Sequence, residues 1–152
     1  MSILRDILAV AHSGLRWVAL LLLLFAIINA FRSMNSGQYT DKTKKLNLFA
    51  MVVLHLQFVI GLGLMFVSGK VNYSEGWMKI PMWRFFGMEH ILMMLIAIVV
   101  VTIGRSKTKR LTGSRDKHKR IAIWYTIALI IILAAIPWPF RAELAGGWIG
   151  ID

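Results

Sequence analysis

The chain has 152 residues, of which 58% are hydrophobic and 16% are charged, and its mean hydropathy is +0.68. An ordinary soluble domain is about 45–50% apolar and about 25% charged, so this composition favours a single membrane domain. There is no cysteine, which excludes disulfides, cysteine-ligated zinc, iron–sulfur clusters and a catalytic thiol. The net charge of +11 lies between apolar segments, so it indicates membrane topology rather than nucleic-acid binding.

Four apolar stretches follow one another along the chain, at about 7–31, 46–68, 82–104 and 121–140. A helix needs about 20 mainly apolar residues to cross the hydrocarbon core of a membrane. The first stretch is too long for the apolar region of a signal peptide, so we expect it to be retained. The sequence therefore predicts an all-α fold, an integral membrane four-helix bundle that forms one domain over residues 1–152.

Two connecting segments carry most of the positive charge. Residues 32–45 hold four basic residues and one acidic residue, and residues 105–120 hold eight basic residues and one acidic residue. The positive-inside rule places both segments in the cytoplasm and both termini outside it. We expect the second segment to face anionic membrane lipid rather than nucleic acid, and we expect His118 within it to be solvated.

Ionisable side chains inside a membrane are costly, so those that persist are candidates for function. The apolar stretches contain five: His12, Arg16, His55, Glu89 and His90. From the predicted topology, the two outermost histidines lie at similar depths, five to nine residues from the outer surface. The helical rise puts His55 roughly 6–12 Å deeper, so one iron ion cannot easily be ligated from both levels.

His12 and His90 are the candidate metal ligands. Two helix-borne histidines that face each other across a bundle provide the axial ligands of a low-spin haem b. Gly61 and Gly63 are expected at the same depth, where missing side chains would let a flat ring approach the backbone. The alternatives are that both histidines bond to neighbouring helices without a metal and that the glycines serve helix packing.

The other polar residues each have two readings. Arg16 lies one helical turn from His12 and could neutralise a haem propionate, or it could form an intramembrane ion pair with Glu89. His55 and Gln57 could contact a quinone or the cofactor edge, or they could bond across helices. A methionine could replace one histidine as an axial ligand, although a pair of histidines is the better candidate.

Three segments carry a resemblance to known proteins: AHSGLRW at 11–17, HLQFVIGLG at 55–63 and MEHILMM at 88–94. They resemble a small family of four-helix bacterial membrane proteins commonly called cytochrome b, over nearly the whole chain. They are also distantly similar to one half of haem A synthase, a four-helix bundle whose histidines hold haem. The resemblance implies haem ligation by His12 and His90 and a multi-pass location in the bacterial cytoplasmic (inner) membrane.

The chain departs from the synthase pattern beside the first histidine. The synthase has a glutamate three residues before a helix histidine and an arginine directly after it, where this chain has Ala9 and Ser13. Oxygen-dependent modification of haem is therefore not expected.

The leading hypothesis is a membrane-bound b-type cytochrome, an electron carrier rather than a stand-alone enzyme. It would exchange single electrons with quinone or with other respiratory subunits. The alternative is a haem-free accessory subunit that stabilises a larger membrane complex. A proton or ion carrier is a third hypothesis, but the ionisable residues fill mainly the outer half of the predicted bundle. No phosphate-binding glycine loop or nucleophile–base set supports nucleotide or hydrolytic chemistry.

Overall fold

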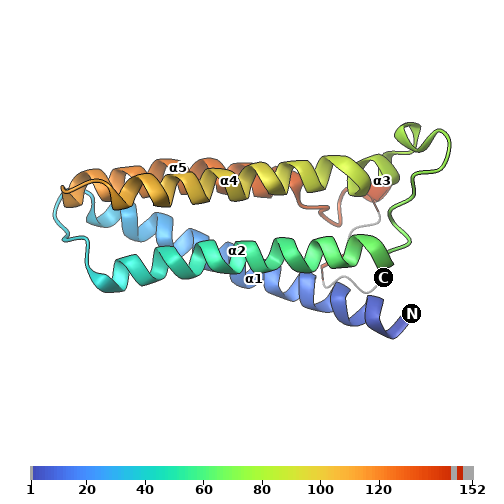
Figure 1. The fold of residues 1–152 in the computed structure, drawn as a ribbon, viewed down its shortest axis with the longest axis horizontal. Coiled ribbons are helices and arrows are strands. Elements are labelled where there is room, and N and C mark those ends of the chain that lie inside the picture. Colours follow the sequence, from blue (N-terminus) through green and yellow to red (C-terminus); the bar gives the residue numbers. More distant parts are fainter. Residues whose placement is uncertain (1, 145–146, 149–152) are drawn as a thin grey trace.

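The computed structural model describes residues 2–144 and 147–148, and within this part all regular structure is helical. Long antiparallel helices run side by side as a bundle (Figure 1). The elements are α1 (Ser2–Ser33), α2 (Asp41–Val67), η1 (Trp77–Lys79), α3 (Pro81–Arg84), η2 (Phe85–Glu89), α4 (His90–Lys109), α5 (Ser114–Ala135) and η3 (Ala142–Leu144). Because α3, η2 and α4 follow without a break, they form one helical segment.

Four helical segments are long and apolar enough to cross a membrane: Ile3–Ser33, Asp41–Val67, Pro81–Lys109 and Ser114–Ala135. The predicted all-α, four-helix architecture is thereby confirmed at the level of helix number and length. The sequence also predicts that both termini lie outside the cytoplasm, and this orientation stays a prediction. Met1 and residues 149–152 lie outside the described residues.

The fourth predicted helix, 121–140, is displaced in the structure. Helix α5 begins at Ser114, seven residues earlier, and ends at Ala135, with Ile136 in an extended conformation at φ −72° and ψ 130°. Pro137 explains the early end, because the residue before a proline is disfavoured in the α conformation. The second helix ends at Val67, one residue before its predicted end, with Ser68 as its C-cap.

Large apolar side chains cover the outside of the bundle. Val59 in the second half of α2 is 64% exposed, and Ile130 in the second half of α5 is 61% exposed. Small residues fill much of the interior, such as Ala26 on α1 and Ala128 on α5, both fully buried. Small residues inside and large apolar residues outside are typical of helices that pack closely within lipid.

The packed core occupies the half of the bundle nearest the connections at 34–40 and 110–113. It contains buried residues of all four long helices, and Leu23 of α1, Val101 of α4 and Ile121 of α5 are completely buried. The other half holds the larger of two cavities, described below. We call these two parts the packed half and the hollow half of the bundle.

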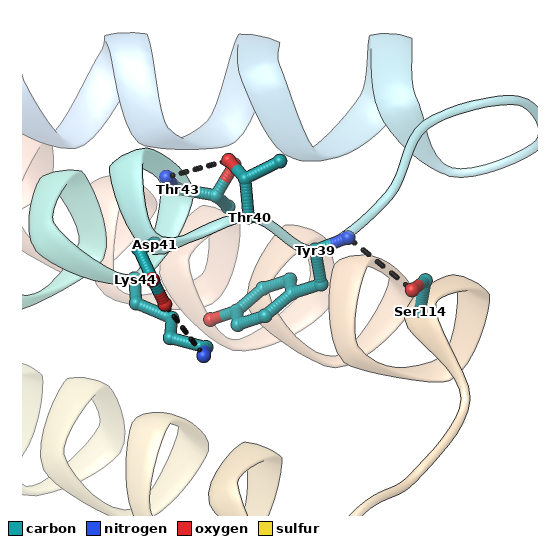
Figure 2. Close-up of polar contacts among 6 residues, drawn as sticks. All are labelled: Tyr39, Thr40, Asp41, Thr43, Lys44 and Ser114. Atoms are coloured by element: carbon teal, nitrogen blue, oxygen red, sulfur yellow. Dashed lines mark hydrogen bonds and ion pairs between the residues drawn. The ribbon is translucent and has the colours of Figure 1, made fainter.

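His118 is buried, which corrects the prediction that it is solvated. Its exposed fraction is 0%, and its ring lies edge-on to Tyr39 with 5.2 Å between centroids. Because α5 begins at Ser114, His118 falls on an inward face of the first turns rather than in a loop. The backbone N–H of Tyr39 donates to Ser114 Oγ at 3.2 Å, which holds the 34–40 connection over this helix start (Figure 2).

Gly104 allows α4 to lie close to α5, because it has no side chain at the contact with Trp124. Substitution of this glycine therefore tests the packing of the two helices. A Cβ atom at Gly104 would overlap the side chain of Trp124, whereas a Cβ at exposed Gly63 would meet nothing within 4 Å. We expect Gly104→Ala to lower the free energy of unfolding by about 1–3 kcal/mol through overpacking. Gly63→Ala, the matched control, should leave it unchanged or raise it by about 0.4–1 kcal/mol. Unfolding in mild detergent measures both, and equal stability of the two variants would contradict this packing.

Candidate functional site

His12 on α1 and His90 at the start of α4 face each other across the hollow half of the bundle. Their ring centroids are 6.3 Å apart, and their planes cross at 74°. They are separated by 78 positions in sequence, yet the antiparallel helices bring them to one level, as their predicted depths require. Both rings are half-buried and line the same cavity.

A hydrogen bond to the end of α5 fixes the imidazole of His90. Its Nδ1 lies 2.7 Å from the carbonyl oxygen of Ala135. A carbonyl oxygen only accepts, so Nδ1 must carry the proton, and Nε2 is left with its lone pair. Metal-binding histidines are commonly oriented in this way, with one ring nitrogen donating to a carbonyl and the other facing the metal.

Two prolines make carbonyl groups at the end of α5 available to side chains. In a continued helix the carbonyl of Ala135 would accept from residue 139 and that of Leu133 from residue 137, but both positions are proline and have no N–H. The indole N–H of Trp138 donates to Leu133 O at 2.9 Å, and His90 Nδ1 donates to Ala135 O. The sequence therefore contained a signal for this contact in Pro137 and Pro139.

Helix α2 shapes the environment of His12. Gln57 Nε2 donates to the backbone carbonyl of His12 at 2.7 Å, which ties α2 to α1 at this level. A Cβ atom on Gly61 would lie 2.8 Å from His12 Cε1, so the glycine makes room for the imidazole itself. A Cβ atom on Gly63 would meet no other atom within 4 Å, and Gly63 does not line the cavity. Of the two predicted glycines, only Gly61 lies at the site, and it accommodates a histidine ring.

A π-helical turn directly precedes His90. In η2 (Phe85–Glu89), the N–H of His90 bonds to the carbonyl of Phe85, five residues back instead of four. The wider turn shifts the helix face on which all later residues of α4 lie, and such turns are frequent at functional sites. It also places the rings of Phe85 and Phe86 next to His90, with centroid distances of 5.7 and 6.3 Å. No periodicity in the sequence signalled this turn.

The two histidines open onto a cavity of about 420 Å³ in the hollow half of the bundle. This volume is within the range of roughly 300–1,000 Å³ that holds small ligands and cofactors. Its walls are mainly apolar and come from all four long helices. Its polar lining includes the predicted site residues His12, Arg16, Gln57 and His90, together with other polar side chains, which are Arg5, Asp6, Ser13, Ser68 and Lys70. Predicted site residues from three helices thus meet around one space.

Arg16 reaches the cavity and forms no ion pair with a carboxylate of the described residues. Its Nη2 donates to the carbonyl of Trp148 at 2.7 Å and to that of Gly147 at 3.4 Å, while its Nε is buried and has no hydrogen-bond partner in the same part of the chain. Glu89 instead binds Arg84 at 2.7 Å. The ion pair between Arg16 and Glu89, one of the two predicted alternatives, is therefore not formed.

His55 is separate from the other site residues. Its Nδ1 lies 2.8 Å from the carbonyl of Met51, one turn back in α2, and its Nε2 lies 3.4 Å from Thr102 Oγ1 on α4. It does not line the cavity, whereas Gln57 does. The structure therefore does not bring His55 and Gln57 together as a pair, and the contacts of His55 match the reading in which it bonds across helices.

The donor set around the cavity suits a metal that takes two axial imidazoles. Within residues 2–144 and 147–148, no group of three or more histidine or carboxylate side chains could hold an ion by itself. The ring centroids of His12 and His90 are 6.3 Å apart, and His90 Nε2 keeps its lone pair because Nδ1 donates to Ala135. Among the described residues His12 Nδ1 is buried and has no hydrogen-bond partner, so each imidazole has a nitrogen that could bind a metal.

No family model matches the chain, and no curated protein or solved structure is detectably similar to it.

Gly61 gives a test of the site that needs no ligand. We expect Gly61→Ala to displace the His12 ring, because the new methyl group would press on Cε1. The measurement is NMR of protein labelled with ¹⁵N-histidine in detergent, where His12 ring signals should shift and those of His55 should not. Gly63→Ala is the control on the same helix, and a His12 shift of the same size in the control would refute this packing.

Proposed function

We propose that this protein is a membrane-bound b-type cytochrome in which His12 and His90 bind one haem as axial ligands. The observation that carries the proposal is the pair of imidazoles with centroids 6.3 Å apart, one of them held by Ala135 so that its Nε2 is free. A haem between them would supply one-electron oxidation and reduction. The protein would act as an electron carrier for quinone or for other respiratory subunits.

The residues around the pair have distinct roles in this proposal. His90 is oriented by the Ala135 carbonyl, and His12 is positioned by Gly61 and by the Gln57 contact. Arg16 has no carboxylate partner within the described chain, so its charge is available to an acidic group in the cavity such as a propionate. The mainly apolar walls of the cavity would partly bury the haem, and burial is one of the means by which proteins set a haem potential.

Membrane insertion and orientation are part of the same proposal. The four long segments cross the bacterial cytoplasmic membrane, with the connections at 34–40 and 110–113 inside and the cavity in the outer half. The support is the mean hydropathy of an 18-residue stretch in each of the four segments, between 1.5 and 2.3, together with the basic residues near the two connections. In this orientation His12 and His90 lie nearer the outer surface.

An optical spectrum of the purified protein tests the haem proposal. We expect reduced-minus-oxidised bands of a six-coordinate b-type haem, with one haem per chain. His12→Ala and His90→Ala should each remove the bands or convert them to a high-spin form, because one axial ligand is lost. His55→Ala is the matched control, since this intramembrane histidine lies off the cavity, and its spectrum should be unchanged.

The same purified protein also distinguishes the cytochrome from the alternative function, a haem-free accessory subunit. A haem-free protein that copurifies with larger partners in mild detergent would support an accessory subunit and would reject the cytochrome. Bands that persist in both the His12 and His90 variants would also reject the ligand pair.

The absence of cysteine allows a direct test of orientation. Single substitutions Thr112→Cys and Ser74→Cys place one thiol at an exposed position at each end of the bundle. In intact cells, a maleimide that does not cross membranes should label position 74 and should label position 112 only after the cells are opened. The reverse pattern would invert the proposed orientation, and labelling of both positions in intact cells would reject it.

A further inference from the structure

A second, smaller pocket of about 230 Å³ lies at the packed end of the bundle, far along the helices from the histidine pair. It is formed by the first turns of α2 and α5, the last turns of α4 and the connection that precedes α2. It is lined by Tyr39, Lys44, Arg105, Thr108, Lys109 and Lys117. Four of these six residues are cations and none is acidic.

The positive charge of this pocket is only partly neutralised. Lys44 binds Asp41 at 2.8 Å on the exposed side of α2, as Figure 2 shows. The ammonium group of Lys117 lies 5.6 Å from the centroid of the Tyr39 ring. In the part of the chain that the structure describes, no carboxylate forms an ion pair with Arg105, Lys109 or Lys117. The pocket therefore holds three cations that an anion could pair with.

Tyr39 adds a neutral hydrogen-bond donor to these charges. Asn47 Nδ2 donates to the Tyr39 hydroxyl oxygen at 2.9 Å, so the phenol serves as acceptor there and keeps its own proton for another partner. Asn47 is 1% exposed, and its backbone carbonyl accepts from Tyr125 at 2.7 Å, which fixes this arrangement from α5. Burial raises the pKa of Tyr39, so the hydroxyl stays protonated at neutral pH.

We propose that this pocket binds the phosphate group of an anionic phospholipid. Arg105, Lys109 and Lys117 supply the charge, and the Tyr39 hydroxyl donates a hydrogen bond to a phosphate oxygen. The Tyr39 hydroxyl is held in place by Asn47, so the pocket offers a fixed hydrogen-bond donor as well as positive charge. A surface that attracts anions only through its net charge has no such donor. The inference uses the membrane insertion proposed above but none of the haem chemistry.

The place of the pocket in the fold favours a lipid over a soluble anion. Arg105 and Lys109 lie in the last turns of α4, directly after its apolar stretch, where lipid headgroups meet a spanning helix. The neighbouring Lys107 lies 5.3 Å from the ring of Trp124, and tryptophan is enriched at this level of a membrane. Basic pockets between helices on the cytoplasmic side are known to take phospholipid headgroups.

The experiment is a titration of the full-length protein in a non-ionic detergent with short-chain phosphatidylglycerol, followed by native mass spectrometry. We expect one tightly bound lipid per chain. Arg105→Ala combined with Lys109→Ala should weaken binding about thirtyfold, or about fivefold for each cation removed. Tyr39→Phe removes only the hydroxyl and should weaken it about tenfold, as loss of a hydrogen bond to a charged group does.

The control variant is Arg115→Ala combined with Lys119→Ala, which removes the same charge from exposed positions of α5 outside the pocket. It should change the affinity less than threefold; a loss equal to that of the pocket variant would overturn the proposal. Equal binding of phosphatidylcholine with the same chains would also overturn it. If inorganic phosphate, at the same concentration as phosphatidylglycerol, displaces the lipid from the pocket, the occupant is a soluble phosphate and the lipid assignment is wrong. Haem absorbance in the same samples tests the cytochrome proposal separately.

Discussion

The hydrogen bond from His90 Nδ1 to the carbonyl of Ala135 is the interaction on which the arrangement of the site depends. It joins the start of α4 to the end of α5 and fixes which ring nitrogen keeps its lone pair. It exists because a proline four residues beyond Ala135 cannot occupy that carbonyl. The chain thus uses a helix end to orient a side chain on another helix.

Two further contacts of the same kind connect the other helices. Gln57 on α2 donates to the carbonyl of His12 on α1, and Tyr125 on α5 donates to that of Asn47 on α2. In each case a side chain bonds to a main-chain oxygen of a neighbouring helix. Within lipid such bonds average about 0.6 kcal/mol, so they orient helices more than they stabilise them. Small buried residues, such as Ala26 and Ala128, let the helices pack closely in the packed half, whereas the hollow half keeps its cavity.

Much of the fold was predictable because apolar length directly determines a spanning helix. The convergence of His12 and His90 followed from helix direction and the helical rise. The early end of α5 could have been read from Pro137, but the apolar character of 136–140 concealed it. The burial of His118 was missed for a related reason, since the basic residues around it suggested a loop where the structure has the first turns of α5.

Other features of the site had no signal in a single sequence. The π turn before His90 depends on how α3 and α4 join, and Gly61 and Gly63 are distinguished only by the face of α2 on which each lies. Glu89, one of the two predicted partners of Arg16, pairs with Arg84, and Arg16 donates instead to carbonyls of a tail more than 130 residues away. Local patterns specified the helices, whereas contacts between distant segments specified the site.

Electron paramagnetic resonance of the oxidised protein tests the central claim most directly. Two imidazole ligands, from His12 and His90, would hold a ferric haem in a low-spin state. We predict a low-spin haem signal, and we predict its loss in both His12→Ala and His90→Ala. A signal typical of histidine–methionine ligation, a low-spin signal that persists in both variants, or protein without haem iron, would contradict the account.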